Sequence, residues 1–243
     1  MRRPVRLAVL LAGLAGAACA QSPGAGREIV AAAYDEPTTR YPHAILGDNV
    51  EWGALVLDLA PCAGCGADRV RIRLPETRVF EDVAPRLADV DLDGTAEVVV
   101  VESDVAAGAR LAIYDETGLM AATPFIGRPF RWLAPVGVAD MDGDGWVELA
   151  YVDRPHLART LRVWRFRDGA LEEVASAPGL TNHRIGEADI GGGLRRCGGQ
   201  VEMITASADW SRIIATRLVD GRLISRDMGP HRGRKSLAAA MKC

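Results

Sequence analysis

The stretch of sequence that decides the fold reads Val138-Ala139-Asp140-Met141-Asp142-Gly143-Asp144-Gly145-Trp146-Val147-Glu148-Leu149-Ala150-Tyr151-Val152. It places carboxylates at relative positions 1, 3, 5 and 9 and glycine at position 6, and it continues into an apolar run. Acidic side chains at alternate positions of a tight loop can direct their oxygen atoms to one point, and the glycine permits the turn. The stretch therefore predicts a cation-binding loop that leads into a β-strand.

The same arrangement occurs upstream as Leu87-Ala88-Asp89-Val90-Asp91-Leu92-Asp93-Gly94-Thr95-Ala96-Glu97-Val98-Val99-Val100-Val101. Its first aspartate, Asp89, precedes Asp140 by 51 residues. Weaker copies begin at Asp48, 41 residues before Asp89, and at Asp189, 49 residues after Asp140. The last copy keeps only Asp189 and Glu202 of the carboxylate set, so we expect it to keep the fold without a metal. Self-similarity at such a period indicates a repeat architecture.

The segments between the acidic loops have the composition of β-strands. They are short, rich in Val, Ile and Leu, and bounded by Gly, Asp or Pro, and the pairs Asp168-Gly169 and Asp220-Gly221 favour hairpins. The sequence predicts strands at residues 28–33, 53–59, 69–74, 97–102, 110–114, 119–123, 147–152, 160–165, 171–175, 201–206, 212–218 and 222–226.

Repeat units near residues 41–87, 88–138, 139–187 and 188–228, each with about four strands, predict an all-β fold. The expected architecture is a small β-propeller of about four to five antiparallel blades. The strand at 28–33 and the C-terminal stretch 222–240 would share the blade that closes the ring. An antiparallel β-sandwich is the alternative fold.

Residues 1–20 have the features of a signal peptide: basic residues Arg2, Arg3 and Arg6, an apolar core at 7–14, and the cleavage pattern Ala18-Cys19-Ala20. We expect a periplasmic or secreted protein with a flexible N-terminus at 21–27 and a single domain at 28–243. The apolar core is shorter than the roughly 20 residues of a membrane-spanning helix, so we expect no transmembrane segment. The alternative is a membrane-anchored lipoprotein, because Gly16-Ala17-Ala18-Cys19 could direct lipidation of Cys19.

The charge balance argues against a nucleic-acid partner. Without residues 1–20 the basic count falls from 29 to 26 while 32 acidic residues remain, a formal charge of 26 − 32 = −6. No basic stripe runs along the sequence, as nucleic-acid binding would require. The one basic cluster, Arg232, Arg234 and Lys235, is interpreted as a solvated tail.

Four cysteines remain after cleavage, and an even number in an oxidising compartment predicts disulfides. The spacing of Cys62 and Cys65 favours a local bridge, which leaves Cys197 to pair with Cys243. The second bridge would then lock the closing blade of the ring.

The two complete loops predict a structural calcium site each, about two ions in all. Position 7, Thr95 or Trp146, would contribute a backbone carbonyl, and the donor sets contain only oxygen, which suits a hard cation. Plain acidic surface turns are the alternative. An EF-hand is excluded, because position 12 is Val100 or Tyr151 and both flanks are β-like. The predicted ligands are Asp89, Asp91, Asp93, Thr95 and Glu97 in the first loop and Asp140, Asp142, Asp144, Trp146 and Glu148 in the second.

These loops resemble the FG-GAP repeats of the integrin α-subunit propeller and of bacterial proteins built from VCBS-type units, where D-x-D-x-D-G-x-x-E/D loops join the strands of blades. The resemblance rests on residues 87–101 and 137–152 and is weaker around Asp48 and Asp189. The phenylalanine-glycine and glycine-alanine-proline signatures are poorly kept, with Ala84-Pro85 and Ala134-Pro135 the nearest remnants. The resemblance implies a propeller whose ions hold inter-strand loops.

The sequence lacks the common motifs of nucleophilic hydrolases, zinc proteases and phosphate-binding loops. We therefore expect a binding or scaffolding module for an unknown protein or glycan ligand, with no catalytic residues. The alternative function is a propeller lyase or hydrolase that acts on an extracellular polymer, with His43 or His183 as the base.

Overall fold

The computed structural model of the protein describes residues 27–243. The predicted signal peptide, Cys19 and residues 21–26 of the predicted flexible N-terminus lie outside the described residues. The regular secondary structure of the described residues is β-strand apart from one short helix, which confirms the predicted all-β class. Its elements are β1 (Ile29–Thr38), β2 (Glu51–Leu59), β3 (Arg69–Arg73), β4 (Arg78–Phe80), β5 (Arg86–Ala88), β6 (Glu97–Asp104), β7 (Gly108–Asp115), β8 (Gly118–Ala122), β9 (Leu133–Ala139), β10 (Val147–Asp153), β11 (Thr160–Arg167), β12 (Ala170–Pro178), β13 (Leu180–Thr181), β14 (Gly193–Cys197), β15 (Gln200–Ser207), β16 (Arg212–Val219), β17 (Arg222–Pro230) and α1 (Arg234–Ala240).

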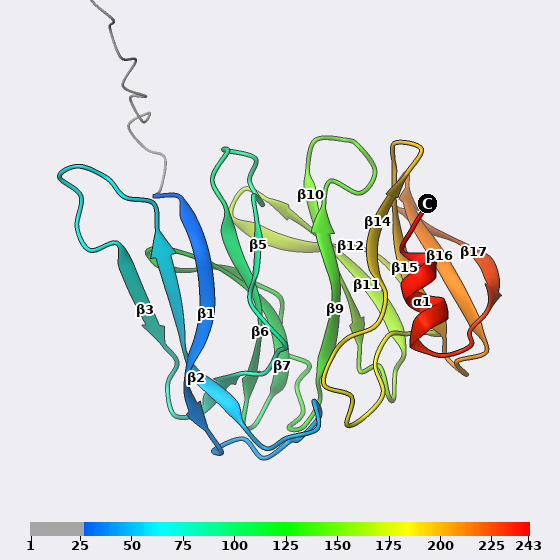
Figure 1. Ribbon diagram of the computed structural model, residues 1–243, viewed down its shortest axis with the longest axis horizontal. Coiled ribbons are helices and arrows are strands. Elements are labelled where there is room, and N and C mark those ends of the chain that lie inside the picture. Colours follow the sequence, from blue (N-terminus) through cyan, green and yellow to red (C-terminus); the bar gives the residue numbers. More distant parts are fainter. Residues whose placement is uncertain (1–26) are drawn as a thin grey trace, which may run out of the picture.

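The strands form antiparallel units that follow one another in chain order. One sheet joins the unit β1-β2-β3 to the unit β5-β6-β7-β8 through the short strand β4. The second sheet is β9-β10-β11-β12, and the third contains β14-β15-β16-β17 with β13 added beside β15. Figure 1 shows these units in a row, with β1 near one end and α1 at the other. Each meander has the strand order of a propeller blade.

The hydrophobic core lies between neighbouring units. Successive side chains of a strand point to opposite faces. In β6, Val99 and Val101 pack in the cluster shared with β9 and β10, whereas Val98 and Val100 pack against the first unit. In β10, Leu149 faces back toward β6 while Val152 faces forward toward the fourth unit. In these two inner units the second strand is apolar on both faces because the unit has a neighbour on each side.

The prediction that the two ends of the chain share a closing blade is wrong. β1 pairs with β2 and β17 pairs with β16, and these strands lie at opposite ends of the row. Each end has a cover of its own. At the N-terminal end the outward face of β3 presents Arg69, Arg71 and Arg73, which form ion pairs with Asp58 of β2 and with Asp35 and Glu36 of β1.

At the C-terminal end the cover is the helix α1. Its buried residue Leu237 packs on Ile204, Ile213 and Ala215, on the outward face of the last sheet. The helix occupies a region that the sequence suggested to be a solvated tail; instead, Arg234 forms ion pairs with Glu187 and Asp189.

The structure contains both predicted disulfides, Cys62–Cys65 and Cys197–Cys243. The first closes the loop between β2 and β3. The second joins β14 to the last residue of the chain and so holds α1 against the sheet, rather than locking a ring. None of the helices in residues 27–243 is both long and apolar enough to span a bilayer.

Candidate metal centre

Both acidic loops occupy the same place in their units. Each connects the first strand to the second, β5 to β6 in one case and β9 to β10 in the other. The pairing of Ala88 with Glu97, and of Ala139 with Glu148, brings the ninth-position glutamate beside the first position of its loop. The antiparallel register therefore gathers carboxylates that are eight residues apart in sequence.

The backbone within the two loops is organised in the same way. Val90 and Met141 donate their amide hydrogens to Glu97 and Glu148, at N···Oε2 distances of 2.8 and 2.9 Å. The position-6 glycines, Gly94 and Gly145, have φ angles of 94° and 87°, in the region that favours glycine. Their amides donate to the position-1 aspartates, both at 3.1 Å. The loops are thus preformed turns around a ring of carboxylate oxygens.

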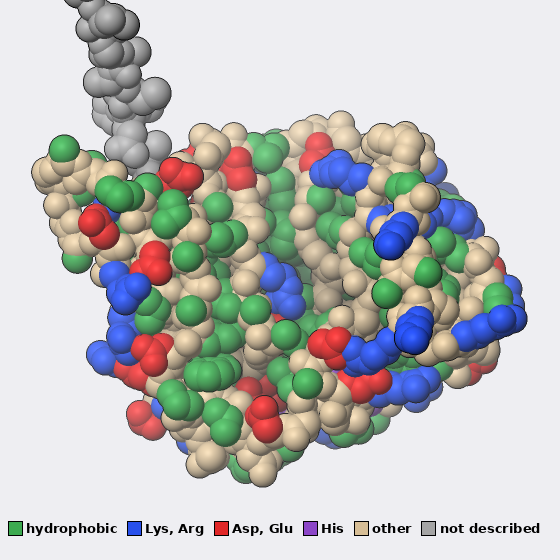
Figure 2. All heavy atoms as spheres, viewed as in Figure 1, with side chains coloured by type: hydrophobic (Ala, Val, Ile, Leu, Met, Phe, Trp, Pro, Cys, Tyr) green, Lys and Arg blue, Asp and Glu red, His purple; other side chains and the backbone are tan. Residues whose placement is uncertain are grey.

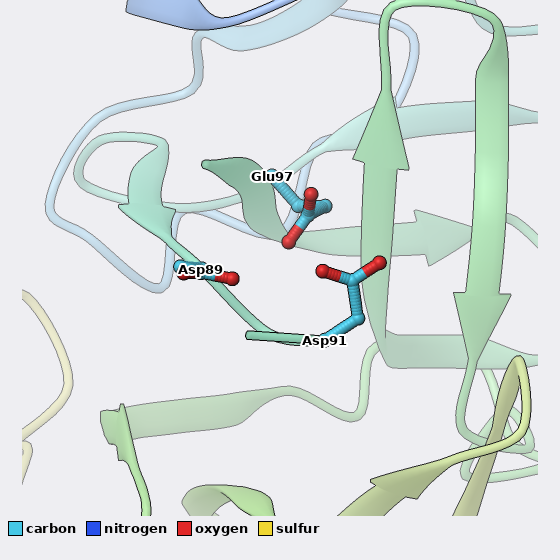
Figure 3. Close-up of side chains that lie close together, drawn as sticks. All are labelled: Asp89, Asp91 and Glu97. Atoms are coloured by element: carbon cyan, nitrogen blue, oxygen red, sulfur yellow. The ribbon is translucent and has the colours of Figure 1, made fainter. Parts of the chain in front are cut away.

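The structure brings together positions 1, 3 and 9 of each predicted ligand set. In each loop one carboxylate oxygen from each of the three residues lies within 4.8 Å of the others. Figure 3 shows the carboxylates of the first set directed toward a common space. These two clusters, each able to hold a metal ion, are Asp89, Asp91 and Glu97, and Asp140, Asp142 and Glu148.

Positions 5 and 7 of the predicted sets make other contacts. Asp93 accepts hydrogen bonds from the amide and hydroxyl of Thr95, both at 2.7 Å. Asp144 accepts one from the amide of Trp146 at 3.0 Å, and the guanidinium of Arg167 lies 4.9 Å from the centre of the Trp146 ring. These residues shape the turns.

The first cluster is poor in compensating positive charge. Glu97 is buried, and this burial, together with the charges of Asp91, Asp93 and Asp89, raises its pKa to about 7. Asp89 Oδ1 is buried and has no hydrogen-bond partner within residues 27–243. An unpartnered carboxylate oxygen among other carboxylates fits a hard, oxygen-binding cation.

The second cluster has an arginine in contact with it. Arg165 of β11 donates from Nε to Glu148 Oε1 at 2.6 Å and from Nη2 to Asp142 Oδ2 at 2.9 Å, and its Nη1 lies 2.8 Å from Asp144 Oδ2. Burial raises the pKa of Glu148, and the hydrogen bond from Arg165 opposes that shift. The sequence analysis did not identify this residue.

The two histidines proposed as bases lie in different surroundings. His43 Nδ1 is 2.5 Å from Oε1 of the buried Glu81, and His43 lines a cavity of about 240 Å³ together with Phe130, Trp132 and His156. His183 is fully buried, with Nδ1 3.1 Å from His156 Nε2 and Nε2 2.8 Å from the carbonyl oxygen of Glu187. Both nitrogens of His183 are engaged within the protein, so only His43 has the placement of a base that faces a cavity.

Comparison with known proteins agrees with the repeat pattern. The family described as FG-GAP-like repeat matches residues 89–151, which begin at the first aspartate of the first loop and include the whole of the second. No curated protein matches the chain. The chain therefore contains an FG-GAP-like repeat segment, and this segment carries both acidic clusters.

Proposed function

We propose that the protein is an exported binding or scaffolding module whose blade-like units are stabilised by calcium at the first acidic cluster. The observation that carries the metal assignment is the buried Oδ1 atom of Asp89, which lacks a partner within residues 27–243 and belongs to the same cluster as Asp91 and Glu97. Without a cation these carboxylates repel one another. An ion held by all three would join the loop to the start of β6.

The role of this ion is structural. Asp89 and Asp91 belong to the connection between β5 and β6, and Glu97 is the first residue of β6. An ion that binds the folded loop better than the unfolded chain raises the free energy of unfolding by mass action. We therefore expect calcium to raise the melting temperature by about 5–10 °C when it is present at about a hundredfold excess over its Kd.

The test compares melting of the purified protein in calcium and after exhaustive chelation. The Asp89→Asn variant should melt at nearly the same temperature in both conditions, because it removes one ligand charge from the site. Asp168→Asn is the matched control, since Asp168 is an exposed aspartate in the hairpin between β11 and β12. Equal melting of the unaltered protein with and without calcium would refute the metal assignment.

Export is supported by the disulfides. Both pairs need an oxidising compartment to persist, and extracellular and periplasmic spaces provide one. Mass spectrometry of the protein recovered from its native host distinguishes the two forms of export. A mature chain that begins at Gln21 identifies a periplasmic or secreted protein, and a chain that begins at a lipidated Cys19 identifies a membrane-anchored one.

The partner of the module would be a protein or a glycan that meets one face of the row of units. A second candidate function, an enzyme that acts on an extracellular polymer, is favoured by the pairing of His43 with the buried Glu81 beside a cavity. A carboxylate can orient a histidine as a general base. Turnover of polysaccharide or ester substrates that His43→Ala abolishes would establish the enzyme; no turnover across such a panel supports the binding module.

A further inference from the structure

We propose that the second acidic loop carries its own cation, the guanidinium of Arg165, so that the folded chain binds one calcium ion rather than two. This inference rests on the proposed calcium site at the first cluster. It assigns different roles to two loops that share a sequence pattern: the first requires a metal from outside, and the second is neutralised from within the fold.

The contacts of Arg165 carry the inference. Its three guanidinium nitrogens each lie within 3 Å of a carboxylate oxygen, from Asp142, Asp144 and Glu148. Two of these residues belong to the second cluster, and Asp144 is the third aspartate of the loop. The side chain of Arg165 is only 20% exposed, so these are charge-assisted hydrogen bonds in a partly desolvated place. A calcium ion bound by Asp142 and Glu148 would have to compete with the arginine for these carboxylates.

The equivalent position in the first loop has the opposite charge. Arg165 is the cross-strand partner of Glu148 in the β10–β11 hairpin. In the β6–β7 hairpin, Val98 pairs with Tyr114, and one more step along the register places Asp115 opposite Glu97. The carboxylate of Asp115 accepts hydrogen bonds within its own turn, from Thr117 and Gly118. No intramolecular cation is therefore supplied to the first loop from this position.

The fourth unit shows the same internal neutralisation carried further. Glu202 stands at the position that Glu97 and Glu148 occupy in their units, and Arg195 and Arg226 both form ion pairs with it. The register of β15 and β16, continued one step from Met203 and Thr216, places Arg217 opposite Glu202. Along the row, this cross-strand position changes from Asp115 to Arg165 to Arg217, and the acidic loop pattern fades in the last unit.

The charged residues that line the cavities beside the two loops also differ, with more arginines beside the second loop. The cavity beside the second loop, of about 610 Å³, is lined by Arg165, Arg196 and Arg217 as well as by the aspartates. The cavity beside the first loop, of about 430 Å³, is lined by Asp115 and Glu116 in addition to the loop acids. Its one lining arginine, Arg27, donates instead to Asp68 and to the carbonyl oxygens of Ala60 and Ala67. Figure 2 shows basic side chains gathered over the C-terminal end of the row. The local field therefore favours a divalent cation at the first loop over the second.

Calcium titration of the full chain, by calorimetry and by equilibrium dialysis, tests the inference. We expect one ion per chain for the unaltered protein and for the control Asp168→Asn, and none for Asp89→Asn. Arg165→Gln should bind a second ion, and Asp140→Asn added to Arg165→Gln should remove it again. Two ions bound by the unaltered protein, or only one bound by a folded Arg165→Gln variant, would overturn the inference while leaving the proposed calcium site intact.

A reciprocal variant keeps the test decisive if Arg165→Gln fails to fold. Asp115→Arg places an arginine opposite Glu97, and we expect it to weaken calcium binding at least tenfold, whereas the matched control Asp115→Asn should retain it. Unchanged affinity in Asp115→Arg would contradict the inference. Absence of calcium binding by the unaltered protein has a different meaning, since it would refute the proposed function itself.

Discussion

Glu51, the first residue of β2, shows how a single side chain can make stability depend on pH. It is only 3% exposed, and burial raises its pKa to about 9, with further contributions from Glu81, Asp48 and Asp82. In the unfolded chain the same carboxyl group has an ordinary pKa near 4.3. Between these two values the folded protein keeps a proton that the unfolded chain loses, so the free energy of unfolding falls as pH rises.

We expect Glu51→Gln to flatten this dependence. At pH 5, only slightly above the pKa of the unfolded carboxyl group, both folded proteins carry an uncharged side chain at this position, and their stabilities should differ least. The difference in free energy of unfolding between the variant and the unaltered protein should be larger at pH 8 than at pH 5, by at least about 1 kcal/mol in favour of the variant. The reason is that the variant has no proton to lose at this position. Urea unfolding at the two pH values measures this change. Glu76→Gln is the control, since the Glu76 side chain is 92% exposed and should produce no such difference.

The contact of Arg165 with Glu148 is one that residue spacing in the sequence does not predict. The ligand set of the second loop can be derived from spacing alone, because alternate aspartates and a glycine define the turn. The partner of Glu148, in contrast, depends on the register of β10 against β11, which the intervening residues 154–159 determine through their own turn geometry. That register is a property of the folded hairpin, so the sequence gives no spacing rule for it.

At the scale of elements, the helix α1 depends on its attachments. It has seven residues, no side-chain cap at its N-terminus and no acidic residue in its first turn, so it lacks the signals that predict a helix and the length that stabilises one alone. Leu237 and the disulfide to Cys197 supply the stability that the segment itself lacks. The helix therefore depends on tertiary contacts, which the sequence of the segment itself does not reveal.

The two disulfides should contribute unequally. The chain-entropy relation gives about 4 kcal/mol for the bridge that spans 46 residues and about 2 kcal/mol for the bridge that spans three. Urea unfolding of Cys197→Ser/Cys243→Ser and of Cys62→Ser/Cys65→Ser compares them directly. We expect the first pair of substitutions to lower the free energy of unfolding about twice as much. Equal losses would show that the attachment of α1 adds little to the last sheet.

The strands also divide into those that their own composition predicts and those that depend on their pairing partners. Runs such as those in β6, β10 and β15 were predicted because both of their faces are buried against apolar neighbours. The strands β5, β9 and β14, which precede or lie near the acidic loops, were not identified individually. They are short, or contain proline and glycine as Leu133–Ala139 does, and they have no regular alternation of apolar and polar residues. Their pairing partners define them, rather than their own composition.

At the scale of the whole molecule, the repeat period and the blade-like meanders were predictable, but the relation between the two ends was not. Closure of a ring depends on the angle between successive sheets, which no local pattern encodes. The outward arginines of β3 could be identified as alternate charged residues, yet only the fold shows that they pair with Asp35, Glu36 and Asp58 to cover an end. A sequence of repeats predicts neighbours more reliably than it predicts the two outermost faces.

Because each unit packs mainly against its neighbours, loss of the proposed ion should act locally. We expect chelation of calcium to accelerate amide hydrogen exchange in β5 and β6, the strands joined by the first loop. Exchange in β16 and β17 should change much less, since a whole unit separates them from that loop. Mass spectrometry of peptides after exchange measures both regions in one sample. Equal acceleration throughout would indicate that the row unfolds as one cooperative body.

The separate covers at the two ends have a consequence for how such a chain can change its length. A closed ring admits only the number of blades that completes a circle, so adding one strains all the others. This row has an arginine-bearing sheet at one end and a disulfide-held helix at the other. It can accept a duplicated inner unit between β8 and β9, because the apolar faces of the new unit would pack on the apolar faces that already meet there. This architecture therefore allows the chain to lengthen by duplication of an internal unit while its two ends stay unaltered.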